Sequence, residues 1–405
     1  MPLPEVLAPR GTEPGRYGYA ILGAGCAGLS LCHYLLERGV EEPILILDRK
    51  EAFADDRTWC FWDVEETPFS DRAVRRWSSW AVRTGGRKIV HTSGRYPYLC
   101  LTGADFYGDA LEKISTRGNV TVRLGEDVRS LKEFDDGALI VTSTGSYSAE
   151  NVFDARGLPP DSAVLEEARR QGGWISQQFL GLRLRARRPV FDPDTCTLMD
   201  FSVDQGRGLR FAYVLPFDER EALVENVYLS EKGAPPEAHR AELSGYLRDR
   251  YGLLDWDYEM LGEEWGDIPM TAHRFPRRAG ARTHVVGTLG GETRPSTGYT
   301  FLRVQRYCRA LAASLTGDEV DPGRVHPWRY GPLDRVFLRL LRERPESCPG
   351  IYARMFARTP PAALVRFLTE RSTPLDDARL IWALPKLPFL RLAAGEAIDR
   401  ARESL

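Results

Sequence analysis

A glycine-rich turn between two short apolar runs constrains the fold of this chain more than any other feature. Residues 19–22 form an apolar run that leads into Gly23-x-Gly25-x-x-Gly28, where an amphipathic helix is predicted to begin. Residues 44–47 form the second run. In such a strand–helix–strand unit, the first glycine permits a tight turn, the second lets a pyrophosphate approach the backbone, and the third lets helix and strand pack closely. The pattern predicts a Rossmann-like α/β domain that binds a dinucleotide.

An acid closes this unit. Asp48 follows the second run directly, and a carboxylate at that place accepts hydrogen bonds from the ribose hydroxyls of the nucleotide. Arg49 beside it is a further candidate for the cofactor site. The phosphates are expected on the free N–H groups at the start of the helix. The motif does not choose between FAD and NAD, but its place near the N-terminus of a long chain favours FAD and a flavoprotein.

The composition excludes several other classes of protein. The 405 residues are enough for two or three structural units, and a formal net charge of -2 gives no support for a nucleic-acid partner. Residues 1–16 lack the apolar core of a signal peptide, and we expect them to be disordered. No apolar run approaches the roughly 18 residues of a membrane-spanning helix. The seven cysteines and six histidines are scattered, which favours a cytoplasmic protein with reduced thiols and no metal site.

Three large aromatic residues follow a polar group within residues 56–63, which read DRTWCFWD. If this segment lies at the cofactor, Arg57 and Thr58 reach the cofactor while Trp59 and Phe61 line an apolar substrate cavity. The alternative is a segment that only packs in the core, since Trp and Phe are usually buried for their apolar area. The pattern leaves both interpretations open.

Strand patterns divide most of the chain into two units. Residues 17–175 and 280–320 are predicted to form a discontinuous FAD-binding domain, in which 120–124 and 138–144 are strands of a small antiparallel sheet. Residues 176–279 are predicted to form a β-rich substrate-binding domain. The predicted fold is therefore α/β, of the flavoprotein type with two dinucleotide-binding domains, followed by a helical C-terminal region.

Carboxylates in the second unit are candidates for acid–base chemistry. Glu225 interrupts an otherwise apolar predicted strand, and it points either to solvent, which is the commoner case, or into an apolar cavity. In a cavity, desolvation raises the pKa of the carboxyl group, so that it holds a proton at neutral pH and can act as a general acid. Residues 263–271, EEWGDIPMT, bring Glu264 and Asp267 close to Trp265. They form either a charged loop leading into a strand or further carboxylates at the cavity.

A second glycine-containing segment precedes a helix predicted to begin near residue 300. Backbone of this kind at a helix N-terminus favours contact with a cofactor, and it would complete the site that begins at Gly23. Many flavoproteins have an acid directly after the first glycine of this segment, whereas here the residue is Thr288. The candidate cofactor-binding residues in the segment are Gly287, Pro295, Thr297, Gly298 and Tyr299.

Residues 321–405 are predicted to be helical. They contain 15 Lys and Arg against 10 Asp and Glu, and they include the run LIWALPKLPFLRLA. Basic helices that carry Trp, Phe and Leu can lie in a membrane interface, which would place the protein on the inner face of the membrane. A packed helical cap is the alternative.

Short motifs from residue 19 to about residue 381 resemble, in order, those of the bacterial lycopene cyclases, flavoproteins that close the rings of carotenoids. The motifs are GAGCAGLS, RTWCFW, YLCLT, VFDARG, QQFLG, MDFSVDQ, RFAYVLP, LVENVYLS, EEWGDIPMT and RPSTGYTF. The chain departs from the family pattern in two places. Asn226 and Val227 follow Glu225 where an acid and a threonine are usual, and Arg294 stands where His is often found.

The resemblance implies a flavoprotein that needs reduced FAD, with NAD(P)H as reductant, for a reaction without net redox change. A linear carotenoid such as lycopene would be protonated on a ψ end group and close to a β-ionone ring through a carbocation. Glu225 matches the family's essential acid, and Glu264 and Asp267 are further catalytic candidates. The expected substrate pocket consists of Trp59, Phe61, Phe201, Phe211, Tyr213 and Trp265. An FAD-dependent hydroxylase or prenyl reductase and a non-catalytic prenyl-lipid carrier stay open as alternatives.

Overall fold

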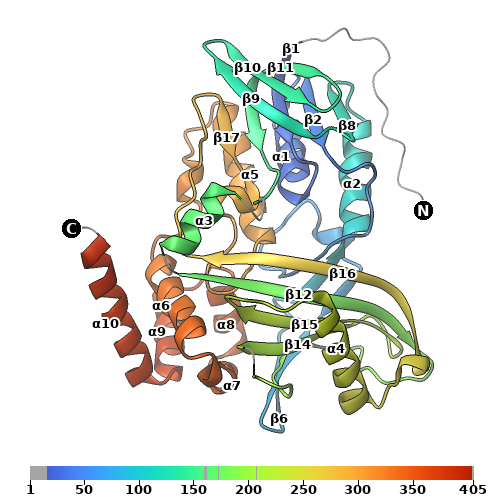
Figure 1. Ribbon diagram of the computed structural model, residues 1–405, viewed down its shortest axis with the longest axis vertical. Coiled ribbons are helices and arrows are strands. Elements are labelled where there is room, and N and C mark those ends of the chain that lie inside the picture. The colour runs from blue at the N-terminus through green and yellow to red at the C-terminus, as the bar shows by residue number, and fades with distance from the viewer. Residues whose placement is uncertain (1–15, 159–161, 172, 207, 404–405) are drawn as a thin grey trace.

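The computed structural model describes residues 16–158, 162–171, 173–206 and 208–403. Within these residues the strands form three sheets, and Figure 1 shows a mixed α/β layer at one end and a larger, mostly antiparallel layer at the other. The predicted α/β class is confirmed. The predicted disordered lead lies outside the described residues, except for Arg16, which begins the first strand.

The first sheet contains the predicted strand–helix–strand unit. Its strands are ordered β8-β2-β1-β11-β10-β9, with β17 beside β11. The strands β8, β2, β1, β11 and β17 run parallel to one another, whereas β10 is antiparallel to both β11 and β9. Three helices cover the face to which Ile21, Ile44 and Ile46 point. The strands are β1 (Arg16–Leu22), β2 (Ile44–Asp48), β8 (Val120–Leu124), β9 (Val128–Phe134), β10 (Gly137–Thr142), β11 (Ser146–Asp154) and β17 (Thr283–Val285). The helices are α1 (Cys26–Glu37), α2 (Gly103–Ser115) and α5 (Phe301–Leu315).

One prediction for this region is wrong. Residues 120–124, predicted to pair with 138–144 in a small antiparallel sheet, form β8 and pair in parallel with β2. The reason is the helix α2, which precedes β8 and carries the chain back across the sheet, so that β8 enters in the direction of β2. Of the two predicted segments, only 138–144, which forms most of β10, belongs to an antiparallel ladder, and its partners are β9 and β11.

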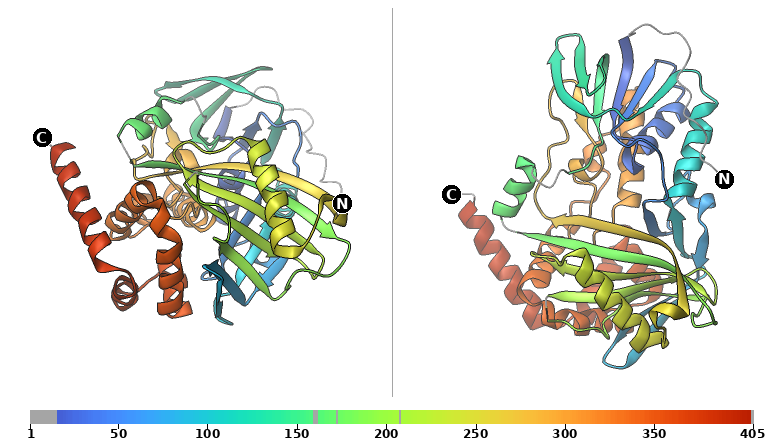
Figure 2. Two further views of the ribbon diagram at one scale, coloured as in Figure 1. Left: turned by 60° about the horizontal axis from the view of Figure 1, so that its bottom comes forward. Right: turned by 45° about the vertical axis from the view of Figure 1, so that its right-hand side comes forward.

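The second sheet is ordered β16-β12-β15-β14-β13-β5-β6 (Figure 2). Its strands β5 and β6 come from residues 79–92, which were predicted to belong to the FAD-binding domain. That part of the predicted division is wrong, because β5 pairs with β13 and so extends the second sheet. The strands are β5 (Ser79–Thr84), β6 (Arg87–Thr92), β12 (Trp174–Ala186), β13 (Thr195–Asp200), β14 (Leu209–Pro216), β15 (Glu221–Ser230) and β16 (Tyr258–Thr271).

The two faces of the second sheet have different neighbours. Leu180 and Val224 belong to the apolar layer beneath the helix α4 (Pro236–Tyr251). Leu223 and Val227 belong to the layer on the opposite face. Side chains alternate along a strand, so Glu225 points to this second face. The face packs against a three-stranded sheet of β3 (Thr58–Trp62), β4 (Arg75–Trp77) and β7 (Tyr98–Thr102).

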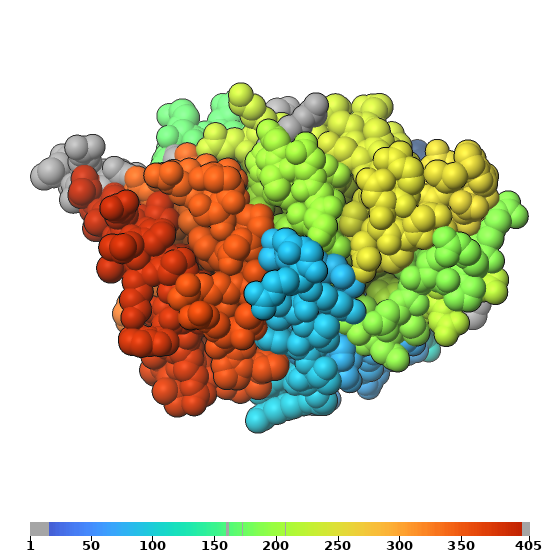
Figure 3. All heavy atoms as spheres, turned by 90° about the horizontal axis from the view of Figure 1, so that it is seen from below, coloured from blue at the N-terminus to red at the C-terminus, as the bar shows by residue number. Residues whose placement is uncertain are grey.

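Helices make up most of the C-terminal region, as predicted. Figure 3 shows these helices, in orange and red, beside the β5–β6 hairpin in blue. The ring of His91 on β6 donates from Nε2 to the carbonyl oxygen of Phe356 over 2.6 Å, which joins the two. The helices are α6 (Tyr330–Glu343), α7 (Cys348–Arg358), α8 (Pro361–Leu368), α9 (Pro374–Ala383) and α10 (Lys386–Glu403), and a further helix, α3 (Ala163–Arg170), precedes β12.

Candidate active site

The three glycines of the first turn have separate structural roles. Gly23 has φ +108°, and a Cβ there would lie 2.7 Å from the carbonyl oxygen of Ala155. A Cβ on Gly28 would lie 1.9 Å from the carbonyl oxygen of Gly23, so only glycine lets the helix pack here. A Cβ on Gly25, in contrast, would meet none of the described residues within 4 Å. The second glycine therefore faces open space, where a ligand can approach the backbone.

The start of α1 and the end of β2 fit a dinucleotide. Within the described part of the chain, no side chain caps the helix at Gly25, so its first N–H groups are free for phosphate. Asp48 lies beside this turn, because its carboxylate accepts from the backbone N–H of Ala24 over 2.6 Å and of Lys50 over 2.9 Å. Arg49 is exposed at the same edge. The predicted cofactor-binding residues of the first unit thus lie together.

The second glycine-containing segment contacts both the first turn and the second sheet. Gly287, with φ +71°, begins a short 3₁₀ helix (Gly287–Gly290), and a Cβ there would lie 2.8 Å from the Cβ of Ala27 in α1. Gly298, also with φ +71°, would place a Cβ 2.5 Å from Oε1 of Gln177 on β12. Pro295, Thr297 and Tyr299 lie in the same loop before α5. The loop from Gly287 to Gly298 therefore runs from the first turn to the second sheet. A cofactor bound at both of these places would lie along this loop.

Two carboxyl groups meet on the inner face of the second sheet. The strand β12, which lies between β15 and the edge strand β16, places Gly181 directly between Glu225 on β15 and Glu264 on β16. A Cβ on Gly181 would lie 3.1 Å from the Cγ atoms of both glutamates. The absence of a side chain at this position therefore lets two acids on non-adjacent strands reach each other.

The environment of this pair favours one shared proton. Glu225 is 8% exposed, and burial, followed by the charge of Glu264 and a hydrogen bond to it, raises the pKa of Glu225 well above its ordinary value. Burial also raises the pKa of Glu264, but hydrogen bonds with Glu225 and Thr58 and the charge of Arg57 oppose that rise. Two carboxyl groups in contact cannot both ionise readily, so the pair favours a state with one shared proton.

The pair faces residues of the three-stranded sheet. Arg57 and Thr58, which were predicted to reach the cofactor, lie beside Glu264, and Cys60 and Trp62 were not singled out by the sequence analysis. Thr58, Cys60 and Trp62 share one face of β3, since they alternate with Trp59 and Phe61. Oγ1 of Thr58 donates to Oε2 of Glu264 over 3.0 Å. Cys60 lies directly opposite Cys100 on β7, and both thiols are close enough to the pair to interact with it electrostatically. The sequence of β3 showed that alternate side chains would lie on two faces of the strand. It did not show which of these faces would lie against the acids.

Three of the residues predicted to line the substrate pocket lie in the apolar layer on the same face of the second sheet as Glu225. The hydroxyl groups of Tyr213 and Tyr98 lie 2.9 Å apart, and burial raises the pKa of Tyr213 well above its ordinary value. Phe201 and Phe211 belong to the same apolar layer, with ring centroids 5.8 Å apart. These residues give the acids an apolar neighbourhood.

Other predicted residues lie elsewhere. Asp267 is exposed and accepts from Nε2 of Gln178 over 3.0 Å, and Trp265 packs on His239 of α4, with centroids 5.1 Å apart. Both were predicted at the cavity. The prediction is wrong because Asp267 and Trp265 are an odd number of residues from Glu264, which puts them on the opposite face of β16.

Trp59 and Phe61 likewise point away from the acid pair. The Trp59 ring packs against that of Phe106, with centroids 5.0 Å apart, and Phe61 stacks on Phe301 at 4.4 Å. Both rings belong to the core beneath the first sheet, and Phe61 also lines the cavity described next. Their role in a substrate pocket stays a prediction.

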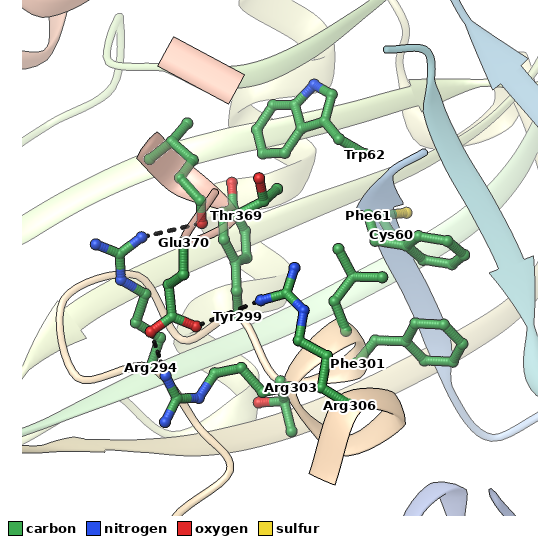
Figure 4. A pocket seen from close by; sticks show the side chains of 13 residues that line it. Cys60, Phe61, Trp62, Arg294, Tyr299, Phe301, Arg303, Arg306, Thr369 and Glu370 are labelled. Carbon is green, nitrogen blue, oxygen red and sulfur yellow. Dashed lines mark hydrogen bonds and ion pairs between the residues drawn. The ribbon is translucent and has the colours of Figure 1, made fainter. Parts of the chain in front are cut away.

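A cavity adjoins the site behind β3 (Figure 4). Its apolar wall consists of Cys60, Phe61, Trp62, Tyr299 and Phe301, together with Leu302 and Leu368. Its polar wall carries Arg294, Arg303, Arg306, Thr300, Thr369 and Glu370. In Figure 4 the Glu370 carboxylate lies between two of these arginines, at 2.6 Å from Arg303 and 3.8 Å from Arg306.

Arg294, one of the two departures from the family pattern, has a structural role. It is fully buried, pairs with Asp334 of α6 at 2.9 Å, and donates to the carbonyl oxygens of Phe367 and Leu368 over 2.8 and 3.0 Å. The guanidinium therefore ties the loop before α5 to the C-terminal helices. A planar group with five donors suits this task.

Comparisons with known proteins agree with this geometry. The chain is 24% identical to the lycopene beta-cyclase of Pantoea ananas, over 94% of this chain and 98% of that protein, and 26% identical to that of a Paracoccus species, over 91% and 94%. Among solved structures, a flavoprotein/dehydrogenase from Cytophaga hutchinsonii superposes with a TM-score of 0.61 at 16% identity, over 96% of this chain and all of that one. The family model described as lycopene cyclase protein matches residues 19–394. The chain belongs to the lycopene cyclase protein family.

Proposed function

We propose that this protein is a lycopene β-cyclase, which closes ψ end groups of lycopene or a related linear carotenoid to β-ionone rings. The observation that carries the proposal is the close approach of the buried Glu225 to Glu264 in an apolar layer, where burial raises the pKa of Glu225 well above its ordinary value. A protonated carboxyl group without access to bulk water is the acid that a hydrocarbon double bond needs. Membership of the family supports the same activity.

The residues of the pair have complementary tasks in this reaction. Glu225 gives its proton to the terminal double bond, which leaves a tertiary carbocation, and the neighbouring double bond attacks that cation to close a six-membered ring. Loss of a ring proton to the pair then restores Glu225, so that atoms and electrons balance. Glu264, as a fixed carboxylate, stabilises the positive charge as it develops. Tyr213 and Trp62 can add a cation–π attraction of about 2 kcal/mol each when desolvated.

Reduced FAD, with NAD(P)H as the reductant, is the proposed cofactor. Gly25, the free N–H groups of α1 and Asp48 would hold its pyrophosphate and ribose, and the loop from Gly287 to Gly298 would hold the remainder. When bound, reduced flavin would supply a negative charge that stabilises a carbocation. The fold shared with a flavoprotein supports this proposal. We further assign substrate binding to the β-rich unit, residues 176–279, with the correction made above for 79–92.

Substitution of the acid tests the proposal. Glu225→Gln removes the proton but keeps the shape, and it should lower ring formation roughly 100- to 10,000-fold. The matched control is Asp267→Asn, on the opposite face, which should leave the rate unchanged. The assay supplies lycopene to the reduced holoprotein and measures both β-rings and mass, because a cyclase yields an isomer whereas a hydroxylase or reductase changes the mass and consumes NAD(P)H. β-ring formation by Glu225→Gln at the normal rate would refute the role of Glu225.

We also propose that the C-terminal helices rest on the inner face of the cytoplasmic membrane, where a carotenoid hydrocarbon resides. On α9 and α10, Trp382, Leu387 and Leu390 are 73%, 69% and 66% exposed, beside Lys386 and Arg391. Apolar side chains with flanking cations suit an anionic bilayer surface. Among the helices in the described ranges, none is both long and apolar enough to cross a bilayer.

A further inference from the structure

The two acids of the pair differ in what their neighbours donate to them. Glu264 accepts from Thr58, whose hydroxyl comes from β3, outside the second sheet, over 3.0 Å. Glu225 lies on β15, further inside the sheet than the edge strand β16, and it interacts with the Glu264 carboxyl group and the thiol of Cys60. Hydrogen bonding to a carboxylate stabilises its charged form. The geometry therefore gives the negative charge a better position on Glu264 than on Glu225.

Charged groups around the pair strengthen this asymmetry. The guanidinium of Arg57 lies beside Glu264, because its Nη1 donates to the carbonyl oxygen of Trp265 over 3.0 Å. Asp55 opposes the effect of Arg57. The other titratable groups that face the pair are Cys60 on β3, Cys100 on β7 and Tyr213 on β14. None of these three is charged at neutral pH in its ordinary state, so the cation of Arg57 and the hydroxyl of Thr58 decide where the charge rests.

We propose that Thr58 is a positioning residue that holds the charge of the pair on Glu264 and thereby keeps the shared proton on Glu225. The proposal rests on the proposed function, in which Glu225 is the proton donor. Gly181 brings the acids into contact, and Thr58 then breaks the symmetry between them. Without the hydroxyl, both carboxyl groups would compete for the proton, and Glu264 would hold it in a share of molecules.

The proposal predicts the direction of a pH shift. The active pair has one proton, so activity rises with pH through the first ionisation of the pair and falls through the second. The Thr58 hydrogen bond stabilises the charged form of Glu264 and therefore lowers the pKa of the first ionisation. Its removal raises that pKa, and the acidic limb of the profile moves to higher pH, by about one unit for a hydrogen bond to a charged group.

The experiment compares Thr58→Val, which keeps the shape but lacks the hydroxyl, with Thr58→Ser, which keeps the hydroxyl. The holoprotein is assayed with lycopene across pH, and the infrared band of the protonated carboxyl group is titrated in the same variants without substrate. We expect the acidic limb and the band to shift upward in Thr58→Val and to stay in place in Thr58→Ser. If Thr58→Val does not fold, Thr58→Ala removes the hydroxyl with less volume and gives the same test.

The outcomes separate the two proposals. An unshifted limb and an unshifted band in the variants without a hydroxyl would overturn the role of Thr58, even if the protein cyclises lycopene. A band that disappears in Glu225→Gln and shifts in Thr58→Val would support the role of Thr58, even if no ring is formed and the cyclase proposal fails. A merely structural role of Thr58 would lower the amount of folded protein without moving either titration.

Discussion

Gly181 is the residue on which the acid pair most directly depends, since any side chain there would stand between two carboxyl groups. Gly181→Ala places a Cβ 3.1 Å from both Cγ atoms and 3.0 Å from Cδ1 of Leu223. We expect the acids to separate, ring formation to fall about 100-fold, as for a 1 Å misplacement, and stability to fall by about 1–3 kcal/mol from overpacking.

Gly262 on β16 gives the matched control for this prediction. A Cβ there meets nothing within 4 Å in the part of the chain that the structure describes, so Gly262→Ala should change neither quantity. Rates of ring formation and thermal unfolding of both variants provide the measurement. A Gly181→Ala protein as fast as the control would show that the acids need not be in contact.

The sequence singled out Glu225 as a candidate acid, whereas it did not indicate the surroundings of this residue. An acid in an apolar strand is conspicuous, and the family resemblance pointed to the same residue. Which of Glu264, Trp265 and Asp267 lies beside Glu225 depends on which face of β16 points to the interior. The packing of the neighbouring elements decides that orientation, and the local sequence does not. The same ambiguity applies to β3. The alternation of its side chains was visible in the sequence, but the face that Trp59 and Phe61 share, which points away from the acids, was not.

At the scale of elements, two glycines of the turn between β1 and α1 are expected to have different roles. Gly25 serves cofactor binding, whereas Gly28 serves the stability of the fold. Gly25→Val adds a side chain in the open space where the pyrophosphate is proposed to approach, so FAD should be lost while the apoprotein unfolds within about 0.5 kcal/mol of the parent. Flavin absorbance after gel filtration and denaturant unfolding of the apoprotein measure the two effects.

Gly28→Ala is the contrasting change in the same element. Its Cβ would lie 1.9 Å from a backbone oxygen, which cannot move aside as a flexible side chain can, so the apoprotein itself should be destabilised by about 1–3 kcal/mol. A Gly25→Val protein that retains a normal flavin spectrum would contradict the assignment of this turn to the cofactor.

The order of several helices and strands along the chain could be predicted from the sequence, whereas the pairing of strands in the sheets was harder to predict. The glycine motif and the strand pattern of β15 both follow from local periodicity. β8 and the β5–β6 hairpin do not, since a short apolar run fits a parallel or an antiparallel neighbour equally well. Their partners, β2 and β13, depend on crossovers that bring distant segments together.

For the whole molecule, the proposed chemistry lies where the two layers meet. Thr58 and Glu264 are 206 residues apart in the chain, and their hydrogen bond crosses from the three-stranded sheet to the second sheet. No local pattern encodes such a contact. Arg294 has a comparable task on the other side of the cavity, where it joins the loop before α5 to the C-terminal helices.

The C-terminal helices carry the last prediction, which concerns how the molecule meets its substrate. If α9 and α10 rest on a bilayer, replacing Trp382 and Leu387 by Ser removes two apolar side chains from the interface, at about 1.5–3 kcal/mol each. Binding to vesicles of phosphatidylcholine with phosphatidylglycerol should weaken about 100-fold or more, as measured by cosedimentation. Trp256→Ser is the control, because Trp256 is 69% exposed but precedes β16, away from these helices. Equal loss in both variants, or in neither, would mean that the exposed apolar residues of α9 and α10 do not form the contact, and that lycopene reaches the acid pair from another side of the molecule.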